Sequence, residues 1–278
     1  MAHDKPELYP EEKLLSYSKY YYLEPDPMNP VVLQAIREPL AEEDCLAPED
    51  IAQMFRPGYD HVPLGWRNWD GGSYATMYAQ IPGVTTDMVC WWFTWMFVPP
   101  ASVPREHGNL RYKLWHPTAH FDHYPADEAS WKQLTDESIP IRRRRRGVRE
   151  VAMERVDAGA TAYKTLDMRF RDYSELALPQ ECWDYIESAG TLNILANDHN
   201  VTLQFFRDTS DGCEIILRTW RGFHLDEEGR IVPTPGYATP TPEHVKDDIL
   251  HTLTEMPHLA KLLPGLYAEE GSKPIGAY

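Results

Sequence analysis

The chain has 278 residues, of which 42% are hydrophobic and 25% are charged, as in an ordinary globular protein. Asp and Glu number 43 against 27 Lys and Arg, and the formal net charge of −16 argues against a general nucleic-acid or anionic-membrane binder. Four cysteines without a CxxC pair favour a reduced, cytoplasmic protein, with two disulfides as the alternative. The polar N-terminus and the lack of an apolar run of the ~20 residues that span a bilayer agree with this expectation.

Residues 1–60 are rich in proline, glutamate and tyrosine, and their apolar faces are too small to close a core of their own. Within them we expect an extended segment or aromatic clasp over 16–23 and short helices over 31–40 and 49–55. A turn at 70–72 then precedes an alternating strand that reaches residue 80. The apolar run 86–97 predicts a short helix. We therefore expect an N-terminal arm or cap over residues 1–85, followed by a main domain over 86–278.

Strands dominate the middle of the chain, where short runs alternate between apolar and polar residues. The expected strands cover 109–115, 148–156, 160–170, 189–199, 200–207 and 213–222. Residues 157–159 predict a turn, and the segment 208–212 (DTSDG) is a strong hairpin signal. The polar segment 116–125 predicts a loop that holds three histidines. Antiparallel strands followed by one long C-terminal helix indicate an α+β fold, in which a curved sheet grips a helix around a cavity.

Five consecutive arginines, Arg142 to Arg146, form the most conspicuous charged run. A nucleic-acid patch is one interpretation of them. The net charge of −16 and the flanking Pro140 and Gly147 instead favour a solvated loop or a contact with an acidic surface. We assign these arginines no chemistry.

The stretch 241–263 predicts the long helix, because Thr241 suits the N-cap and Pro242 suits the first helical position. Its apolar residues recur at helical spacing and predict a buried stripe of Val245, Ile249, Leu253, Met256 and Leu263. The other face carries His244, Asp248, His251, Glu255 and His258. Because His251 and Glu255 are four residues apart, one turn can present an imidazole and a carboxylate to a single ion. A solvated face with chance histidines is the alternative, and we expect His244 and His258 at the surface or behind the site.

A divalent ion in a hydrolase usually takes histidine and carboxylate ligands from separate elements and keeps a position open for water. Besides the helix pair, the sequence offers His120 or His123 on the polar loop. It also offers Glu150 or Glu154 on the following strand. Glu154 lies in an apolar stretch, where a metal ion or an arginine would have to satisfy its carboxylate. The sequence contains no GxSxG elbow, P-loop or GxGxxG motif. The residues alone leave the metal site open.

Five segments together resemble the diacetylphloroglucinol hydrolases and the related phloretin hydrolases: SYSKYYYLEPDPMNPVV, IPGVTTDMVCWWFTWM, LRYKLWHPTAHF, RDTSDGCE and HTLTEMPHLAKLLPGLY. The resemblance covers residues 15–267. It implies a zinc-dependent enzyme that hydrolyses the carbon–carbon bond between an acyl group and a phenolic ring. It also implies a START/Bet v-like helix-grip fold for the catalytic domain over 86–278, an N-terminal arm or cap over 1–85, and a homodimer.

Matched onto the motifs of that family, the Zn²⁺ ligands fall on His120, Glu154, His251 and Glu255. A substrate-contacting tyrosine falls on Tyr112, and His123 falls on a further pocket position. The resemblance leads us to expect a retro-Claisen hydrolysis, in which Tyr112 holds a phenolic oxygen and His123 moves a proton between ring and water. From the residues alone, Tyr112 could equally be a half-buried strand tyrosine and His123 a solvent-facing loop histidine.

The sequence departs from the family where Met96, Gln204 and Thr219 replace two histidines and an aromatic residue. These departures predict an altered substrate pocket around an intact metal frame. Three hypotheses follow. The chain could be a zinc hydrolase of an acylated phenol or related aromatic ketone, or a metal-bound cyclase or isomerase of aromatic polyketides. It could also be a non-enzymatic binder of aromatic ligands, which predicts no metal and no effect of replacing His251 or Glu255.

Overall fold

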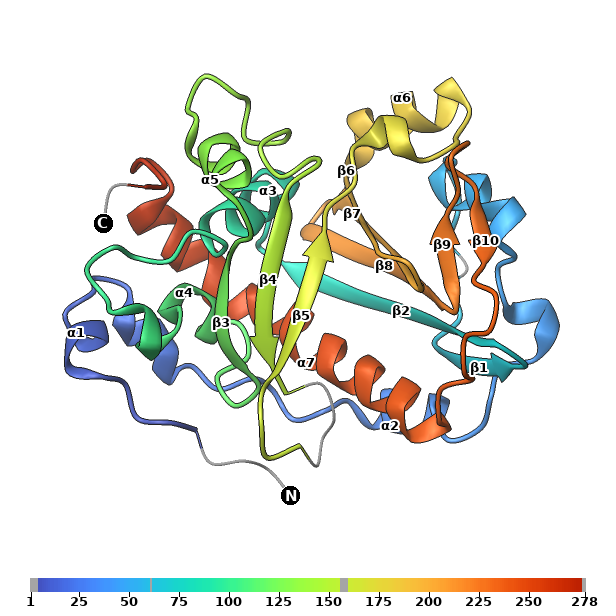
Figure 1. Cartoon of the computed structure of the whole chain (residues 1–278), viewed down its shortest axis with the longest axis horizontal. Helices are drawn as coiled ribbons and strands as arrows, with labels where there is room; N and C mark the ends of the chain where they lie inside the picture. The colour runs from blue at the N-terminus through green and yellow to red at the C-terminus, as the bar shows by residue number, and fades with distance from the viewer. Residues whose placement is uncertain (1–4, 61, 156–159, 277–278) are drawn as a thin grey trace.

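The structure, a computed structural model, describes residues 5–60, 62–155 and 160–276. Two antiparallel sheets and the long C-terminal helix α7 (Pro242–Glu270) form its frame, and short helices surround them (Figure 1). None of the helices in the described ranges combines the length and the apolar composition that crossing a membrane requires. All four cysteines are free thiols.

The larger sheet has five strands in the order β1-β2-β8-β7-β6. Two of its hairpins turn at residues 70–71 and 210–211, inside the two segments predicted to be turns. The strands are β1 (Gly65–Trp69), β2 (Gly72–Pro82), β6 (Gly190–Ala196), β7 (Asn200–Thr209) and β8 (Gly212–Arg221). A smaller hairpin joins β9 (Phe223–Leu225) to β10 (Ile231–Pro233).

Side chains of the larger sheet alternate between two apolar clusters, as the period of a strand requires. One face, which we call the inner face, buries Met77 and Leu217 in the same cluster as the apolar stripe of α7. The other face buries Ile216 and Trp220 in a second cluster. That second cluster includes side chains from the 3₁₀ helix η3 (Pro48–Phe55) and from α6 (Gln180–Ala189).

The smaller sheet contains β3 (His120–Pro125), β4 (Arg149–Glu154) and β5 (Lys164–Arg169), with β4 in the centre. The register of β3 on β4 shifts between His120 and Asp122, so Phe121 is an extra residue in a β-bulge. His120 lies opposite Glu154, and His123 lies opposite Ala152. In a regular strand, side chains three residues apart point to opposite faces. The bulge puts both histidines on the face that carries Ala152 and Glu154.

Helix α7 begins as the sequence predicts, because the Thr241 side chain accepts a hydrogen bond from the backbone N–H of His244 and Pro242 occupies the first turn. The predicted stripe of Val245, Ile249, Leu253, Met256 and Leu263 is buried. The helix continues past the predicted end, through Pro257 and Pro264, to Glu270. It packs mainly along β2 and β1.

The N-terminal segments lie against the rest of the molecule rather than forming a core of their own. Lys113 pairs with Glu12 at 2.7 Å, and both side chains are at least nine-tenths buried. The segment 16–23 is not extended: Ser18–Tyr22 forms a 3₁₀ helix, η1, that buries Tyr20 and Tyr21. The other elements here are α1 (Pro10–Lys13), α2 (Pro30–Ala35) and η2 (Glu42–Asp44).

Two predictions in the middle of the chain are wrong. Residues 109–115 do not form a strand, because the Asn109 side chain caps a short helix, α4 (Leu110–Lys113), that is buried on all sides. The predicted loop 116–125 contains strand β3, whose alternation is hidden by the bulge. The apolar run 86–97 does form a helix, α3 (Thr86–Trp95). The remaining short elements are η4 (Arg105–His107), α5 (Glu128–Thr135) and η5 (Tyr173–Glu175).

The α+β class, the antiparallel sheets and the C-terminal helix are confirmed. The helix-grip assignment stays a prediction, and so does the division at residue 85. Strand β2, on one side of that boundary, pairs along its length with β8 on the other side. The predicted turn at 157–159 lies outside the described residues.

Candidate metal centre

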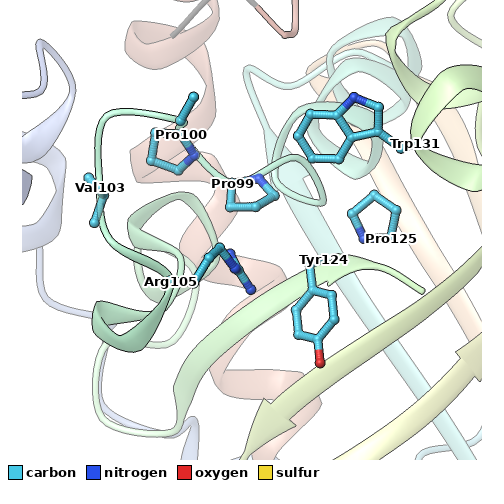
Figure 2. Close-up of a pocket in the computed structure, with 8 residues that line it drawn as sticks. Pro99, Pro100, Val103, Arg105, Tyr124, Pro125 and Trp131 are labelled. Atoms are coloured by element: carbon cyan, nitrogen blue, oxygen red, sulfur yellow. The ribbon is translucent and has the colours of Figure 1, made fainter. Parts of the chain in front are cut away.

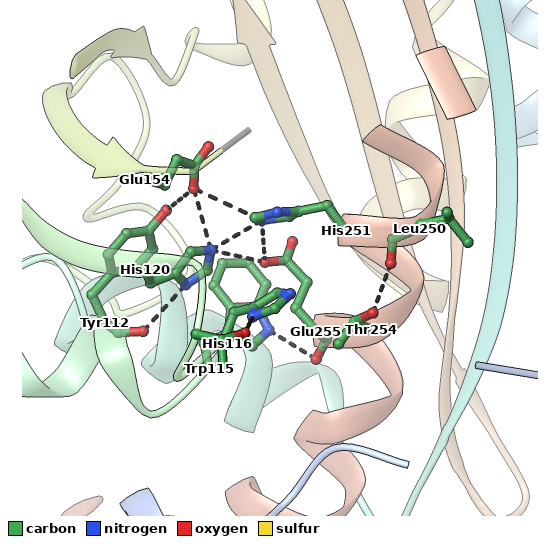
Figure 3. Close-up of polar contacts among 10 residues, drawn as sticks. Tyr112, Trp115, His116, His120, Glu154, Leu250, His251, Thr254 and Glu255 are labelled. Atoms are coloured by element: carbon green, nitrogen blue, oxygen red, sulfur yellow. Dashed lines mark hydrogen bonds and ion pairs between the residues drawn. The ribbon is translucent and has the colours of Figure 1, made fainter. Parts of the chain in front are cut away.

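Four side chains from three elements converge where α7 meets the end of the smaller sheet (Figure 3). His120 Nε2 lies 3.1 Å from His251 Nε2, 3.2 Å from Glu154 Oε2 and 3.3 Å from Glu255 Oε2. His251 Nε2 lies 3.4 Å from Glu255 Oε2 and 3.8 Å from Glu154 Oε2. These are the four residues on which the family resemblance places the zinc ligands.

The spacing and chemistry of these four donors fit one divalent ion. Zinc–nitrogen and zinc–oxygen bonds of about 2.0–2.2 Å in a tetrahedron put neighbouring ligand atoms about 3.3–3.6 Å apart. The measured separations run from 3.1 to 3.8 Å. Ligand atoms of His120, His251 and Glu255 all lie within 4.8 Å of one another, and Glu154 approaches the two imidazoles from the opposite side (Figure 3). Two imidazoles and two carboxylates could therefore hold a cation.

The local structure explains the convergence. Antiparallel pairing puts His120 directly opposite Glu154, so the smaller sheet supplies an imidazole and a carboxylate side by side. Helix α7 supplies the other pair at i and i+4, as predicted. The indole N–H of Trp115 donates a 2.9 Å hydrogen bond to the backbone carbonyl of Glu255. This bond ties the segment before β3 to the turn of α7 that bears the carboxylate.

Tyr112 supports the centre in three ways. Its backbone carbonyl lies 3.2 Å from His120 Nδ1, and since a carbonyl only accepts, Nδ1 carries the hydrogen and the Nε2 lone pair faces the other ligands. Its ring stacks on the His120 ring with centroids 3.8 Å apart. Its hydroxyl donates to Glu154 Oε2. Burial, and then the charges of Glu154 and Glu255, raise the pKa of Tyr112 well above its usual value, so the hydroxyl keeps its proton.

The electrostatics of the four side chains call for positive charge. Burial alone would lower the pKa of His251, but the hydrogen bond and charge of Glu255 and the charge of Glu154 raise it to about 9. Burial would raise the pKa of Glu154, but its hydrogen bond to His120 and the charges of His251 and His120 lower it. Two buried carboxylates are costly unless a cation compensates them. Protons on the histidines or a metal ion could supply that compensation.

His123 and Glu150, the alternative ligands that the sequence left open, lie outside this group. They pair with each other, His123 Nε2 lying 3.0 Å from Glu150 Oε2, and both are buried. His123 is therefore not a solvent-facing loop residue. Its ring meets the Tyr112 ring edge-on, with centroids 4.6 Å apart. Tyr112 itself is buried and lies between the two histidines of β3.

Three other histidines lie outside the four-residue group. His258, expected at the surface or behind the site, is buried. His199 stacks on Tyr237, and His224 contacts Thr234, so both belong to the region around β9 and β10. The three altered positions are all buried: Met96 lies in the main core, Gln204 accepts a hydrogen bond from Asn193, and Thr219 bonds to Thr202 on the neighbouring strand.

Sequence reasoning missed two neighbours of the centre. Trp115 and His116 precede β3, and the His116 ring lies 4.8 Å from the His251 ring, centroid to centroid. The sequence signal for them was that Tyr112, Trp115 and His116 lie close before the candidate ligand His120. The alternation of residues 109–115 instead predicted an ordinary strand there. A surface hollow of about 310 Å³ is lined by none of the four candidate ligands (Figure 2). It is bordered by Pro99, Pro100, Ala101, Val103, Arg105, Tyr124, Pro125 and Trp131.

Comparisons with known proteins agree with the sequence resemblance. The chain is 32% identical over 270 residues to a phloretin hydrolase of Eubacterium ramulus, covering 94% of this chain and 92% of that protein. It is 27% identical over 279 residues to a 2,4-diacetylphloroglucinol hydrolase of Pseudomonas protegens, covering 92% and 85% of the two chains. A solved structure of a conserved protein of unknown function from Enterococcus faecalis matches 81% of this chain and 98% of that chain, with a TM-score of 0.31 and 9% identity. That score gives no support for a shared fold.

A family model covers most of the sheets and most of α7. It is described as the DAPG hydrolase PhiG domain and matches residues 46–268. The match includes all four candidate ligands together with Tyr112 and His123. The chain therefore belongs to the DAPG hydrolase PhiG domain family of enzymes.

Proposed function

We propose that this chain is a zinc-dependent hydrolase that cleaves the carbon–carbon bond between an acyl group and a phenolic, phloroglucinol-like ring. The observation that carries the proposal is the convergence of two imidazoles and two buried carboxylates at tetrahedral spacing. Membership of a hydrolase family, with relatives named for phloretin and 2,4-diacetylphloroglucinol, supports this substrate class.

In this proposal His120, Glu154, His251 and Glu255 hold the metal ion. Two neutral imidazoles and two carboxylates give a charge-neutral site with Zn²⁺. When bound, the ion would supply Lewis-acid polarisation of an acyl carbonyl and a water molecule of lowered pKa. His120 is held for this role by the Tyr112 carbonyl at 3.2 Å, and Glu255 by the Trp115 bond to its backbone.

Two side chains of the protein would bind the phenolic ring and transfer its protons. A hydroxyl ortho to the acyl group lets the ring tautomerise, so that the ring carbon bearing the acyl group gains a proton. When the carbon–carbon bond breaks, that ring leaves as a stabilised phenolate. Tyr112, whose hydroxyl donates to Glu154 at the edge of the four-residue group, would accept a hydrogen bond from a phenolic hydroxyl group. His123, packed beside Tyr112, would move a proton between ring and water.

Two features bear on the alternatives. Buried carboxylates paired with buried histidines argue against a simple binder of aromatic ligands, which gains nothing from such charge. The changes at Met96, Gln204 and Thr219 remain the support for a metal-bound cyclase or isomerase. Product analysis separates these possibilities, because hydrolysis releases a carboxylic acid and the deacylated phenol, whereas cyclisation or isomerisation leaves every carbon in one molecule.

The test has two parts. Elemental analysis of the purified protein should give about one zinc per chain, and incubation with phloretin or 2,4-diacetylphloroglucinol should release the acid and the phenol in equal amounts. A protein that folds but binds no divalent metal would contradict the zinc assignment. A metal-bound protein that converts acylphenols without releasing acid would contradict hydrolysis.

The resemblance extends to assembly and fold. We also propose a cytoplasmic homodimer with a helix-grip catalytic domain. Apolar side chains exposed on the N-terminal segments, Leu14, Tyr22 and Val31, support a second copy as the partner of that surface. Light scattering should give twice the 32.1 kDa of one chain; the mass of a single chain would contradict the dimer.

A further inference from the structure

A second buried polar group lies on the same face of the smaller sheet as the candidate metal ligands. Glu150, Ala152 and Glu154 alternate onto one face of β4, and His123 lies opposite Ala152. His123 is 1% exposed and Glu150 is not exposed at all. The 3.0 Å contact between their side chains is a hydrogen bond, and the Asn109 amide holds the His123 backbone carbonyl at 2.8 Å. The pair is therefore fixed in position.

Arg145 brings a positive charge close to this pair. It is 2% exposed, in contrast to Arg142, which reaches the exposed Asp87. Its guanidinium donates to Asn193 and, at 2.8 Å, to Thr191 on β6 of the larger sheet. Burial raises the pKa of Glu150 well above its usual value, and the charge of Arg145 acts in the opposite direction. The arginine run was thus only partly interpreted correctly, since two of its members, Arg144 and Arg145, are buried.

Each of these three side chains keeps one polar atom without a hydrogen-bond partner within the described parts of the chain: His123 Nδ1, Glu150 Oε1 and Arg145 Nη1. An unsatisfied buried polar atom costs about 1–3 kcal/mol, and native proteins retain few of them unless they have a role or bind a ligand or water. Stability alone gives no reason to keep three such atoms on one hydrogen-bonded pair and the arginine whose charge acts on it.

We propose that His123, Glu150 and Arg145 form a proton-transfer unit, in which His123 Nδ1 exchanges a proton with a carbon of the phenolic ring while Glu150 and Arg145 act as positioning residues. The inference deepens the proposed function, because it assumes a phenolic substrate with its acyl group at the four-residue centre. Tyr112 links the two groups, with its ring 3.8 Å from His120 and 4.6 Å from His123, centroid to centroid. A ring bound beside Tyr112 would reach both.

The protons balance without any further reactant. With the pair neutral overall, one proton lies between Glu150 Oε2 and His123 Nε2, and another is on Nδ1. His123 gives the Nδ1 proton to the ring carbon and takes the shared proton fully onto Nε2. The negative charge then rests on the Glu150 carboxylate, where the charge of Arg145 favours it. When a phenolic oxygen returns a proton to Nδ1, the shared proton moves back and the unit is restored.

The test compares Glu150→Gln with Glu214→Gln in the full-length metal-bound protein. Glutamine fills the same space and its amide can still donate to His123, but it cannot release a proton to the pair. Glu214 is the matched control, because it is also a buried strand carboxylate paired with an arginine, Arg207, and lies away from the site on the other face of the larger sheet. The measurements are zinc content, kcat and KM for phloretin, and enzyme-dependent deuterium uptake from D₂O by the ring of phloroglucinol. Deuterium uptake needs no acyl group.

We expect Glu150→Gln to keep its zinc and a KM within about threefold, while kcat and ring deuteration fall about 100-fold, the lower end of general acid–base effects. Glu214→Gln should leave both rates within about twofold. The double variant with His123→Asn should be no slower than either single variant, because residues acting as a unit are not additive. If Glu150→Gln does not fold, His123→Asn alone must abolish ring deuteration.

Specific results overturn the inference. It fails if Glu150→Gln turns over at the rate of Glu214→Gln, if the parent protein does not deuterate the ring, or if His123→Asn still does. Failure of the proposed function looks different, because the parent protein would then lack zinc or would release no acid from phloretin. Ring deuteration by a protein that releases no acid would still support the proton-transfer unit.

Discussion

The two sheets differ in what they present to the interior. Beneath α7, the inner face of β2 and β8 is apolar, with Met77, Ile215 and Leu217 buried against the helix. The smaller sheet presents His120, His123, Glu150 and Glu154 on the face bearing Ala152. Burying polar and charged groups costs free energy that burying apolar ones gains. The first region is therefore suited to holding the fold together and the second to chemistry, and changes in the two should have separable effects.

Breaking the polar region should have the largest effect. In the combined variant Glu154→Gln, His251→Ala, two of four candidate ligands are gone, so we expect loss of bound zinc and at least a ~1000-fold fall in kcat/KM, since bound metal supplies several kcal/mol of charge stabilisation. Elemental analysis and acid release from phloretin check this. His199→Ala, which changes an exposed histidine, is the control. A variant that keeps zinc at the parent level would refute these ligands.

Breaking the apolar region should cost stability instead. Leu217 is 2% exposed, and Leu217→Ala should lower the free energy of unfolding by about 2–5 kcal/mol because it removes buried methyl groups and leaves a cavity. Urea denaturation measures the loss. The exposed Leu33, changed to alanine, should shift it by less than about 0.5 kcal/mol. Loss of zinc from folded Leu217→Ala protein would show that the two regions are not separable.

Removing the metal should show how much the bound ion in the polar region adds to the free energy of unfolding. A ligand present at 100 times its dissociation constant stabilises the folded state by about 2.7 kcal/mol. Dialysis against a chelator should therefore lower the unfolding free energy of the parent by about that amount. Readdition of zinc should restore it. The combined ligand variant should not respond to either treatment, and a response equal to that of the parent would place the stabilising ion elsewhere.

Tyr112→Phe makes a smaller change, beside the candidate metal ligands. The ring and the backbone carbonyl that orients His120 remain, and only the hydroxyl that contacts Glu154 is lost. We expect zinc affinity or kcat/KM to fall about 10–100-fold, as for other groups that orient metal ligands. Competition with a chelator and steady-state kinetics measure both. Parent values for both quantities would leave Tyr112 a packing residue.

His258 gives the smallest effect, on pH dependence. Burial, and then the charges of Lys261 and Lys5, lower the pKa of His258 from 6.5 to about 4. Between these values the unfolded chain binds a proton at this residue and the folded protein does not, so stability declines as pH falls from 6.5 to about 4. His258→Leu should remove about 1–3 kcal/mol of that decline. An unchanged slope in denaturation measured from pH 7 to pH 4 would contradict this.

How far the sequence predicts the structure depends on whether a feature is local. The cap at Thr241, the stripe of α7 and the hairpin at 208–212 follow from nearby residues, and all three are confirmed. The pairing of His251 with Glu255 is likewise set by one helix turn. By contrast, residues 109–115 were predicted to be a strand from their alternation, whereas the structure has helix α4 there. All four residues of this helix are buried, so its polar positions do not mark a solvent-exposed face.

The candidate site was predictable in part for the same reason. The family resemblance pointed to His120, Glu154, His251 and Glu255, and the structure brings these four side chains together. Spacing alone could not separate His120 from His123, or Glu150 from Glu154, because the choice depends on the β3–β4 register. The burial of Arg145 was also hidden, since its partners Thr191 and Asn193 lie more than forty residues away.

The bulge at Phe121 also bears on which length changes this enzyme can tolerate. Because the extra residue lets two histidines three positions apart share one face, deleting Phe121 would leave them two positions apart in a regular strand, still on that face. Inserting one residue into β4 between Met153 and Glu154 would instead restore one-to-one pairing and turn His120 and Glu154 to the face opposite His123. In alignments of this family, an insertion at this point of β4 would mark a change of chemistry that residue identities alone would not reveal.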